Sequence, residues 1–129
     1  MRILQPPSWV RAKGFSNGIA ATGTLVFIAG QVGWTGQGEW KARDFAGQFR
    51  QCLSNILEVL GEAKGKPEHI VRLTWYVLDK QEYLGSLKAV GEAYRELMGR
   101  HYPTMAVVQV SALVESEARL EIEATAVVP

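Results

Sequence analysis

Two glutamates near the end of the chain have the residue type and spacing for acid–base chemistry. In the run LEIEATAVV, Glu121 and Glu123 alternate with the apolar Leu120, Ile122 and Ala124. In a β-strand, this alternation puts both carboxylates on one face and the apolar side chains on the other. A carboxylate that lines a pocket can act as a general acid or base. The pattern alone favours the simpler alternative, in which both are solvated or paired with the neighbouring Arg119.

Few other side chains have the context of a nucleophile or a metal ligand. Cys52 is the only cysteine and falls on the apolar side of a helical pattern, so we expect it to fill the core. A single cysteine excludes an intrachain disulfide and a cysteine-based zinc site, and this favours a reducing, cytoplasmic location. His69 and His101 lack partners at the spacing of metal ligands, and we expect no metal and no cofactor.

Composition limits the classes of partner. The 129 residues predict one domain, and the formal charge of +1 gives no basic stripe for nucleic acid. No apolar run has the length of a membrane span, and the start of the chain lacks the layout of a signal peptide. We therefore expect neither a nucleic-acid nor a membrane partner.

Hydrophobic spacing predicts the elements that must position these groups. A helix with Asp44 as its N-cap covers residues 44–64, and a second covers 81–98 and ends at Gly99. Strands are expected in 1–14 (an edge strand or extended arm), 15–21, 24–30 and 69–78, with an antiparallel hairpin in 103–129. The fold class predicted is α+β, a two-layer sandwich of a six-stranded, mostly antiparallel sheet with two helices on one face.

Aromatic residues indicate a second use for the other face of this sheet. Trp75 and Tyr76 are adjacent in a strand, so one of them points away from the helices, and a homo-oligomer would bury it. Trp9, Phe15, Trp34 and Trp40 lie in predicted loops or short strands. They mark an interface or a ligand pocket, or they cover the open edge of the sheet; both interpretations remain open.

Three groups of residues carry a family resemblance. These are FSNGI with TLVFIAGQV, then HIVRLTWYVLD, then Pro103 followed by VQVSAL and LEIEATAV. In this order and spacing they resemble the RidA/YjgF family, also called the L-PSP endoribonuclease family. The resemblance implies a chorismate-mutase-like fold and a homotrimer whose sheets form a central barrel. It also implies three small-molecule pockets at the subunit interfaces.

The resemblance also implies roles for particular residues. Glu121 matches the glutamate that orients or activates a water to attack an imine carbon and release ammonia, although the loop before it is one residue longer here. Other matching positions imply a substrate-binding set, which consists of Phe15, Gly30, Gln31, Trp34, Gly91, Met105 and Val107. Phe15 replaces a tyrosine, Gly91 an asparagine and Val107 a cysteine.

Met105 stands where the deaminases of the family have an arginine that grips the substrate carboxylate. Loss of a buried bidentate contact removes on the order of 2–5 kcal/mol of binding for an anion, which argues against a standard 2-imino acid deaminase. Arg72 and Arg119 are the cations that we expect to substitute, if any does.

We therefore expect a trimer that binds a small organic molecule and hydrolyses an imine or enamine with Glu121. A non-catalytic ligand-binding or protein-stabilising trimer is the alternative. The endoribonuclease activity in the older family name has the least support, because no pair of histidines supplies an acid and a base.

Overall fold

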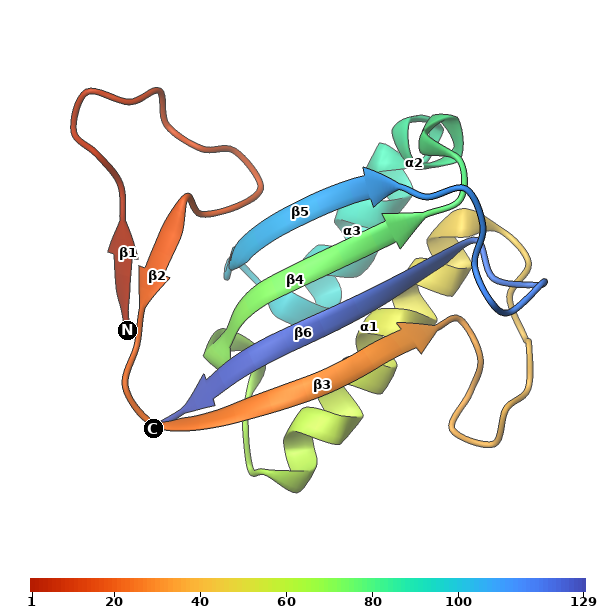
Figure 1. The fold of residues 1–129 in the computed structure, drawn as a ribbon, viewed down its shortest axis with the longest axis horizontal. Helices are drawn as coiled ribbons and strands as arrows, with labels where there is room; N and C mark the ends of the chain where they lie inside the picture. The colour runs from red at the N-terminus through yellow and green to blue at the C-terminus, as the bar shows by residue number, and fades with distance from the viewer.

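The computed structural model describes the whole chain, residues 1–129. The chain forms six strands and three α-helices, whose arrangement can be followed in Figure 1. In chain order the elements are β1 (Arg2–Leu4), β2 (Gly18–Ala20), β3 (Thr24–Val32), α1 (Phe45–Glu62), a 3-10 turn (Pro67–His69), β4 (Ile70–Val77), α2 (Lys80–Gly85), α3 (Leu87–Met98), β5 (Thr104–Gln109) and β6 (Leu120–Val128).

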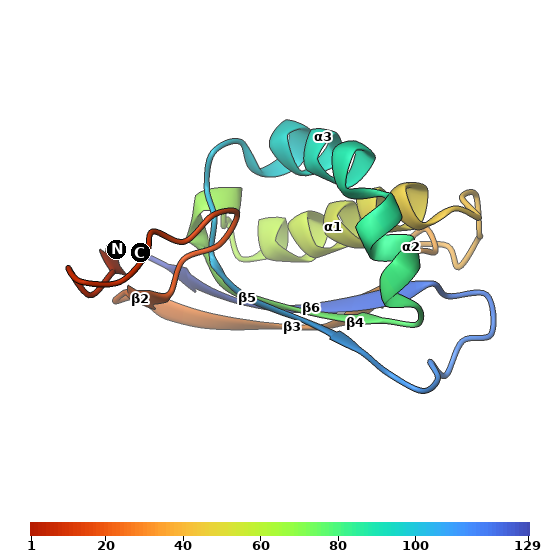
Figure 2. The same cartoon turned by 90° about the horizontal axis from the view of Figure 1, so that it is seen from above.

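Four of the strands form the main sheet, in the order β3-β6-β4-β5. The pairs β3–β6 and β4–β6 are antiparallel, whereas β4 and β5 are parallel. Both long helices, α1 and α3, lie on the same side of this sheet (Figure 2). The α+β, two-layer, mostly antiparallel architecture expected from the sequence is thus confirmed.

The alternation of β6 explains how the two layers hold together. Leu120, Ile122 and Ala124 are buried, and they belong to one core with the apolar side of α1. The rings of Phe49 and Trp75 stack there with centroids 4.8 Å apart. Full burial of such a side chain stabilises the fold by about 1.5–3 kcal/mol, so the helical layer is held chiefly by this face.

The opposite face of the sheet carries no element in Figure 2. Tyr76, which precedes the buried Val77, lies on this bare face, as the adjacent Trp75 and Tyr76 predicted. On the edge strand β3, Leu25 is 59% exposed and Phe27 is 75% exposed. An apolar surface of this kind on a single chain is typical of an interaction site.

The predicted single sheet of six strands is wrong in one respect. β1 and β2 pair only with each other, in a separate two-stranded sheet. Each has three residues, and every residue of β1 is exposed. A strand of three residues offers few backbone hydrogen bonds and little apolar surface with which to join the main sheet.

The predicted hairpin between residues 103 and 129 is also wrong. β5 pairs with β4 alone, and β6 lies between β3 and β4. Both strands have apolar alternation, but that pattern specifies a buried face and not a hydrogen-bonding partner. The fully apolar inner face of β6 suits the centre of the sheet, and the more exposed β5 occupies its edge.

The predicted second helix is divided. α2 ends at Gly85, and α3 begins at Leu87 after Ser86, whose ψ of 10° departs from helical geometry. Gly and Ser both have lower helix propensity than Ala. The predicted ends are confirmed, since Asp44 caps α1 through Gly47 N and Gly99 follows α3 with a φ of 64°.

A buried glutamine, Gln48, joins the loop before α1 to the loop before β6. The Nε2 of Gln48, on α1, donates to the carbonyls of Ala42 (3.2 Å) and Glu117 (2.9 Å). Its Oε1 accepts from the backbone N of Arg119 at 2.7 Å. One fully buried side chain therefore satisfies three backbone groups and ties the loop before β6 to α1.

The substitution Gln48→Leu is expected to lower the free energy of unfolding by about 3 kcal/mol, because buried backbone groups lose their partners. Urea unfolding followed by circular dichroism measures this. The control Gln81→Leu alters an exposed glutamine whose side chain makes no hydrogen bond, and should change stability by less than about 0.5 kcal/mol. Equal losses in the two variants would contradict the role given to Gln48.

Candidate functional site

The carboxylate of Glu121 lies against the backbone of the neighbouring edge strand. Glu121 pairs with Val32 of β3 and with Tyr76 of β4. A Cβ placed on Gly30 would lie only 2.1 Å from Glu121 Oε2 and 2.9 Å from its Cδ. The glycine therefore leaves the space that this carboxylate occupies. The predicted residues Gly30 and Glu121 are brought together.

A bulge in β3 produces this contact. The register between β3 and β6 shifts between Ile28 and Gln31, so that β3 has one residue more than its partner there. Such a bulge bends the strand and redirects the side chains beside it. It turns the glycine backbone toward the bare face, where Glu121 also lies.

The second glutamate of the strand has a partner of its own. Tyr76 Oη donates a 2.6 Å hydrogen bond to Glu123 Oε1. This hydrogen bond to the carboxylate raises the pKa of Tyr76 above its ordinary value, and the charges of Glu123 and Glu121 add to the effect. Glu123 is thus held by a neighbour, while Glu121 has no side-chain hydrogen bond.

Cys52 is a core residue, as expected. It is fully buried on α1. Burial raises the pKa of its thiol, and the charge of Glu121 raises it further. The nucleophilic thiolate is therefore disfavoured.

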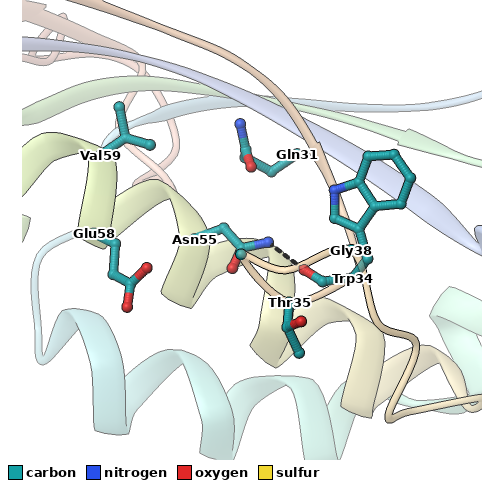
Figure 3. A pocket seen from close by; sticks show the side chains of 8 residues that line it. Gln31, Trp34, Thr35, Gly38, Asn55, Glu58 and Val59 are labelled. Carbon is teal, nitrogen blue, oxygen red and sulfur yellow. Dashed lines mark hydrogen bonds between the residues drawn. The ribbon is translucent and has the colours of Figure 1, made fainter.

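Gln31 and Trp34 lie together, but on the helical side of β3. They line a hollow of about 300 Å³ with Asn55, Glu58 and Val59 of α1 (Figure 3). Asn55 Nδ2 donates to the Trp34 carbonyl at 2.7 Å. Sequence reasoning missed Asn55; the available signal was an amide among the apolar positions of the helix.

The remaining predicted residues gather near the opposite edge of the sheet. Met105 and Val107 are partly buried on the helical side of β5 and pack against the core. Phe15 precedes Ser16, which hydrogen-bonds Tyr102 and Pro103 just before β5. Gly91 lies on α3 and is partly buried. Within one protomer, none of these residues lines a pocket together with Glu121.

The structure separates the two candidate cations. Arg119 forms an ion pair with Glu82 at 3.6 Å. Arg72 is in no ion pair, and it lines a hollow of about 270 Å³ together with Met105. A second hollow, of about 440 Å³ on the bare face, joins Arg72 to Glu123 and Phe27. Arg72 is therefore the cation available beside Met105.

The chain has neither a cluster of metal-ligating side chains nor a helix that could span a membrane. No three or more His, Cys, Asp and Glu side chains are grouped so that they hold a metal ion. None of the helices has both the length and the apolar character needed to cross a membrane.

The four-stranded sheet with helices on one side defines the class of protein, a two-layer α+β domain. Within that class, the chain matches the family model "Endoribonuclease L-PSP" over residues 8–128. It belongs to this family, which is also known as RidA/YjgF. The family expected from the sequence motifs is confirmed.

Relatives of known sequence and structure agree with this assignment. A Rid-family protein of unknown function, YyfB from Yersinia pestis, has a TM-score of 0.86 at 32% identity, covering 98% of each chain. A RutC family protein of Pyrococcus horikoshii is 33% identical over 87% of this chain and 85% of its own. A 2-iminobutanoate/2-iminopropanoate deaminase of Salmonella typhimurium is 30% identical over 81% of this chain and 79% of its own.

The hydrogen bond between Tyr76 and Glu123 makes a testable prediction. Glu123→Gln removes the carboxylate that disfavours tyrosinate, so the pKa of Tyr76 should fall toward the ordinary value of a tyrosine. A titration of the tyrosine ring carbons by NMR measures it. Glu58→Gln, on α1, is the control and should leave Tyr76 unchanged. An unaltered Tyr76 titration in Glu123→Gln would show that the hydrogen bond is absent in solution.

Proposed function

We propose that this protein is a homotrimer that binds a small organic molecule at its subunit interfaces and hydrolyses a C–N bond of the imine or enamine type. The observation that carries the proposal is the carboxylate of Glu121 held over Gly30, with no side-chain partner of its own. The imine deaminase among the relatives supports the reaction class. The buried, unpaired Cys52 fits a reducing location such as the cytoplasm.

The arrangement of the strands supports an assembly. β3 and β5 are the two edges of the main sheet, so Glu121 with Gly30 lies near one edge, and Met105 with Val107 lies on the other. These groups share a pocket only if the β3 edge of one protomer approaches the β5 edge of the next. The exposed Leu25 and Phe27 on the bare face are then buried in the same assembly.

In the proposed reaction, Glu121 accepts a proton from a water molecule while the water oxygen attacks the imine carbon. A C–O bond forms, and the electron pair of the C=N bond moves to nitrogen. The proton passes to that nitrogen and gives a carbinolamine. The carbinolamine hydroxyl then loses its proton, which Glu121 transfers to the amine nitrogen, so that the C–N bond breaks and ammonia leaves as the C=O bond forms. An enamine enters the same route after protonation on carbon gives the imine.

The residues that replace the family's polar groups indicate the substrate. Met105 gives no charge-assisted contact to a carboxylate, and Phe15 has no hydroxyl. Such a contact is worth on the order of 2–5 kcal/mol of binding free energy when it is buried. Its absence favours an imine that carries less negative charge than a 2-imino acid. The same substitutions favour the second candidate function, a non-catalytic ligand-binding or protein-stabilising trimer.

RNA cleavage remains the less favoured reading of the family name, and we propose no nucleic-acid partner. His69 Nδ1 accepts a hydrogen bond from Lys66 N at 2.9 Å, and His101 Nε2 lies 2.6 Å from the Ile70 carbonyl. Each imidazole already has a backbone partner, and the two do not form an acid–base pair.

The trimer is tested by light scattering at micromolar concentration, where wild type should have three times the 14.2 kDa mass of one chain. Phe27→Glu puts a charge on the bare face and should give monomers, because a buried unpaired charge is strongly unfavourable. Leu84→Glu is the matched control, since Leu84 is also exposed but lies on α2. A monomeric wild type would refute the assembly and the interface pockets.

Catalysis is tested by ammonia release from freshly generated imines and enamines, with and without a carboxylate. Glu121→Gln should lower kcat/KM by at least about 100-fold, because an amide does not take a proton from water. Glu123→Gln, two residues away on the same face, should retain activity.

Unchanged turnover in Glu121→Gln would exclude the catalytic role. A silent wild type, with activity on imino acids gained only in Met105→Arg, would favour the non-catalytic alternative.

A further inference from the structure

A groove lies between the N-terminal loop and the segment that leads into β5. The loop between β1 and β2 lies beside the start of β5 in both views (Figures 1 and 2). The groove has a volume of about 620 Å³, and its lining includes Trp9, Arg11, Phe15, Arg100 and Tyr102. A second hollow of about 570 Å³ lies on Trp9, Arg11 and Phe15 as well, and adds Lys13.

The wall formed by the β5 segment is fixed in place. The ring of Tyr102 stacks on Tyr94 of α3, with centroids 5.3 Å apart and planes 5° from parallel. The Tyr94 hydroxyl donates to the His101 carbonyl at 2.5 Å. Ser16 donates through its hydroxyl to the Tyr102 carbonyl and through its N to the Pro103 carbonyl. The groove is therefore largely preformed.

The loop itself is also closed by hydrogen bonds. Asn17 Nδ2 donates to Gln5 Oε1 at 2.8 Å. Gln5 Nε2 lies within 3.5 Å of the carbonyls of Trp9 and Val10. These contacts place Trp9 and the residues after it over the groove.

The charge of the groove has one sign. Arg11 and Arg100 line it, neither belongs to an ion pair, and no carboxylate lines either hollow. Residues 1–38 contain three basic side chains and no acidic one, although the chain as a whole is nearly neutral. A concave site with unpaired guanidinium groups attracts an anion.

Its aromatic side chains are accessible. Trp9 is 61% exposed and Phe15 is 40% exposed, and both line the same groove as Arg11 and Arg100. Flat apolar rings beside cations provide stacking for a planar ligand that carries a negative group.

We propose that this groove binds a small aromatic acid, with its ring among Trp9, Phe15 and Tyr102 and its acid group held by Arg11 and Arg100. The binding is independent of the proposed hydrolysis, although Phe15 borders both sites. All the side chains required come from one protomer.

The test is isothermal titration calorimetry of the full chain with indole-3-acetate, phenyl phosphate and the uncharged indole-3-acetamide. At least one of the two anions should bind at least about ten-fold more tightly than the amide, since hydrogen bonds to charged groups are the stronger ones. The comparison of the two anions distinguishes a carboxylate ligand from a phosphate ligand. Raising the salt concentration should weaken the anion binding.

Four variants decide the assignment. Arg11→Gln and Arg100→Gln should each weaken binding of the acid by roughly ten-fold or more. Lys88→Gln removes one positive charge from α3 outside the groove, and should leave the dissociation constant unchanged. Glu121→Gln, in which hydrolysis is expected to be lost, should still bind the acid. Binding and hydrolysis are therefore measured independently, and one proposal can fail without the other. Equal affinity for acid and amide, or equal losses in Lys88→Gln and Arg100→Gln, would overturn the inference.

Discussion

The register between β3 and β6 is the constraint on which the candidate site depends. Because side chains alternate along a strand, a slip of one residue would move Leu120, Ile122 and Ala124 out of the core and turn Glu121 toward the helices. The bulge before Gln31 adjusts this register locally and presents the glycine backbone to the carboxylate. Gln48 supports the same register from α1, since it binds the backbone just before β6 begins.

The same alternation leaves the sheet with two unlike faces. One is covered by α1 and α3, and the other exposes Leu25, Phe27 and Val108 to solvent in a single chain. Removing apolar surface from water is worth about 25 cal/mol per Å², so a partner on the bare face gains free energy from these side chains. The same alternation thus places Glu121 and these exposed apolar side chains on one face of the sheet.

The sequence predicts local features better than spatial neighbours. Asp44 and the apolar spacing after it predict α1, and the alternation in β6 predicts its buried face, because both signals act within one element. The partner of β5 and the contribution of α1 to the Trp34 hollow depend on contacts between distant segments. The approach of Glu121 to Gly30 followed from family resemblance alone, since no pattern within either strand brings the two together.

Several unpaired arginines lie close to Met105 and the strand that carries it. Met105 on β5 is uncharged, yet Arg72, Arg11 and Arg100 all lie near the start of that strand without ion-pair partners. Each unpaired guanidinium keeps its full capacity for an anion. The positive charge at this end of the sheet therefore lies toward the bare face and the N-terminal loop, and not on β5 itself. An acid bound at this end of the sheet would contact aromatic rings instead of the β5 backbone, which favours larger and flatter ligands than a small imino acid.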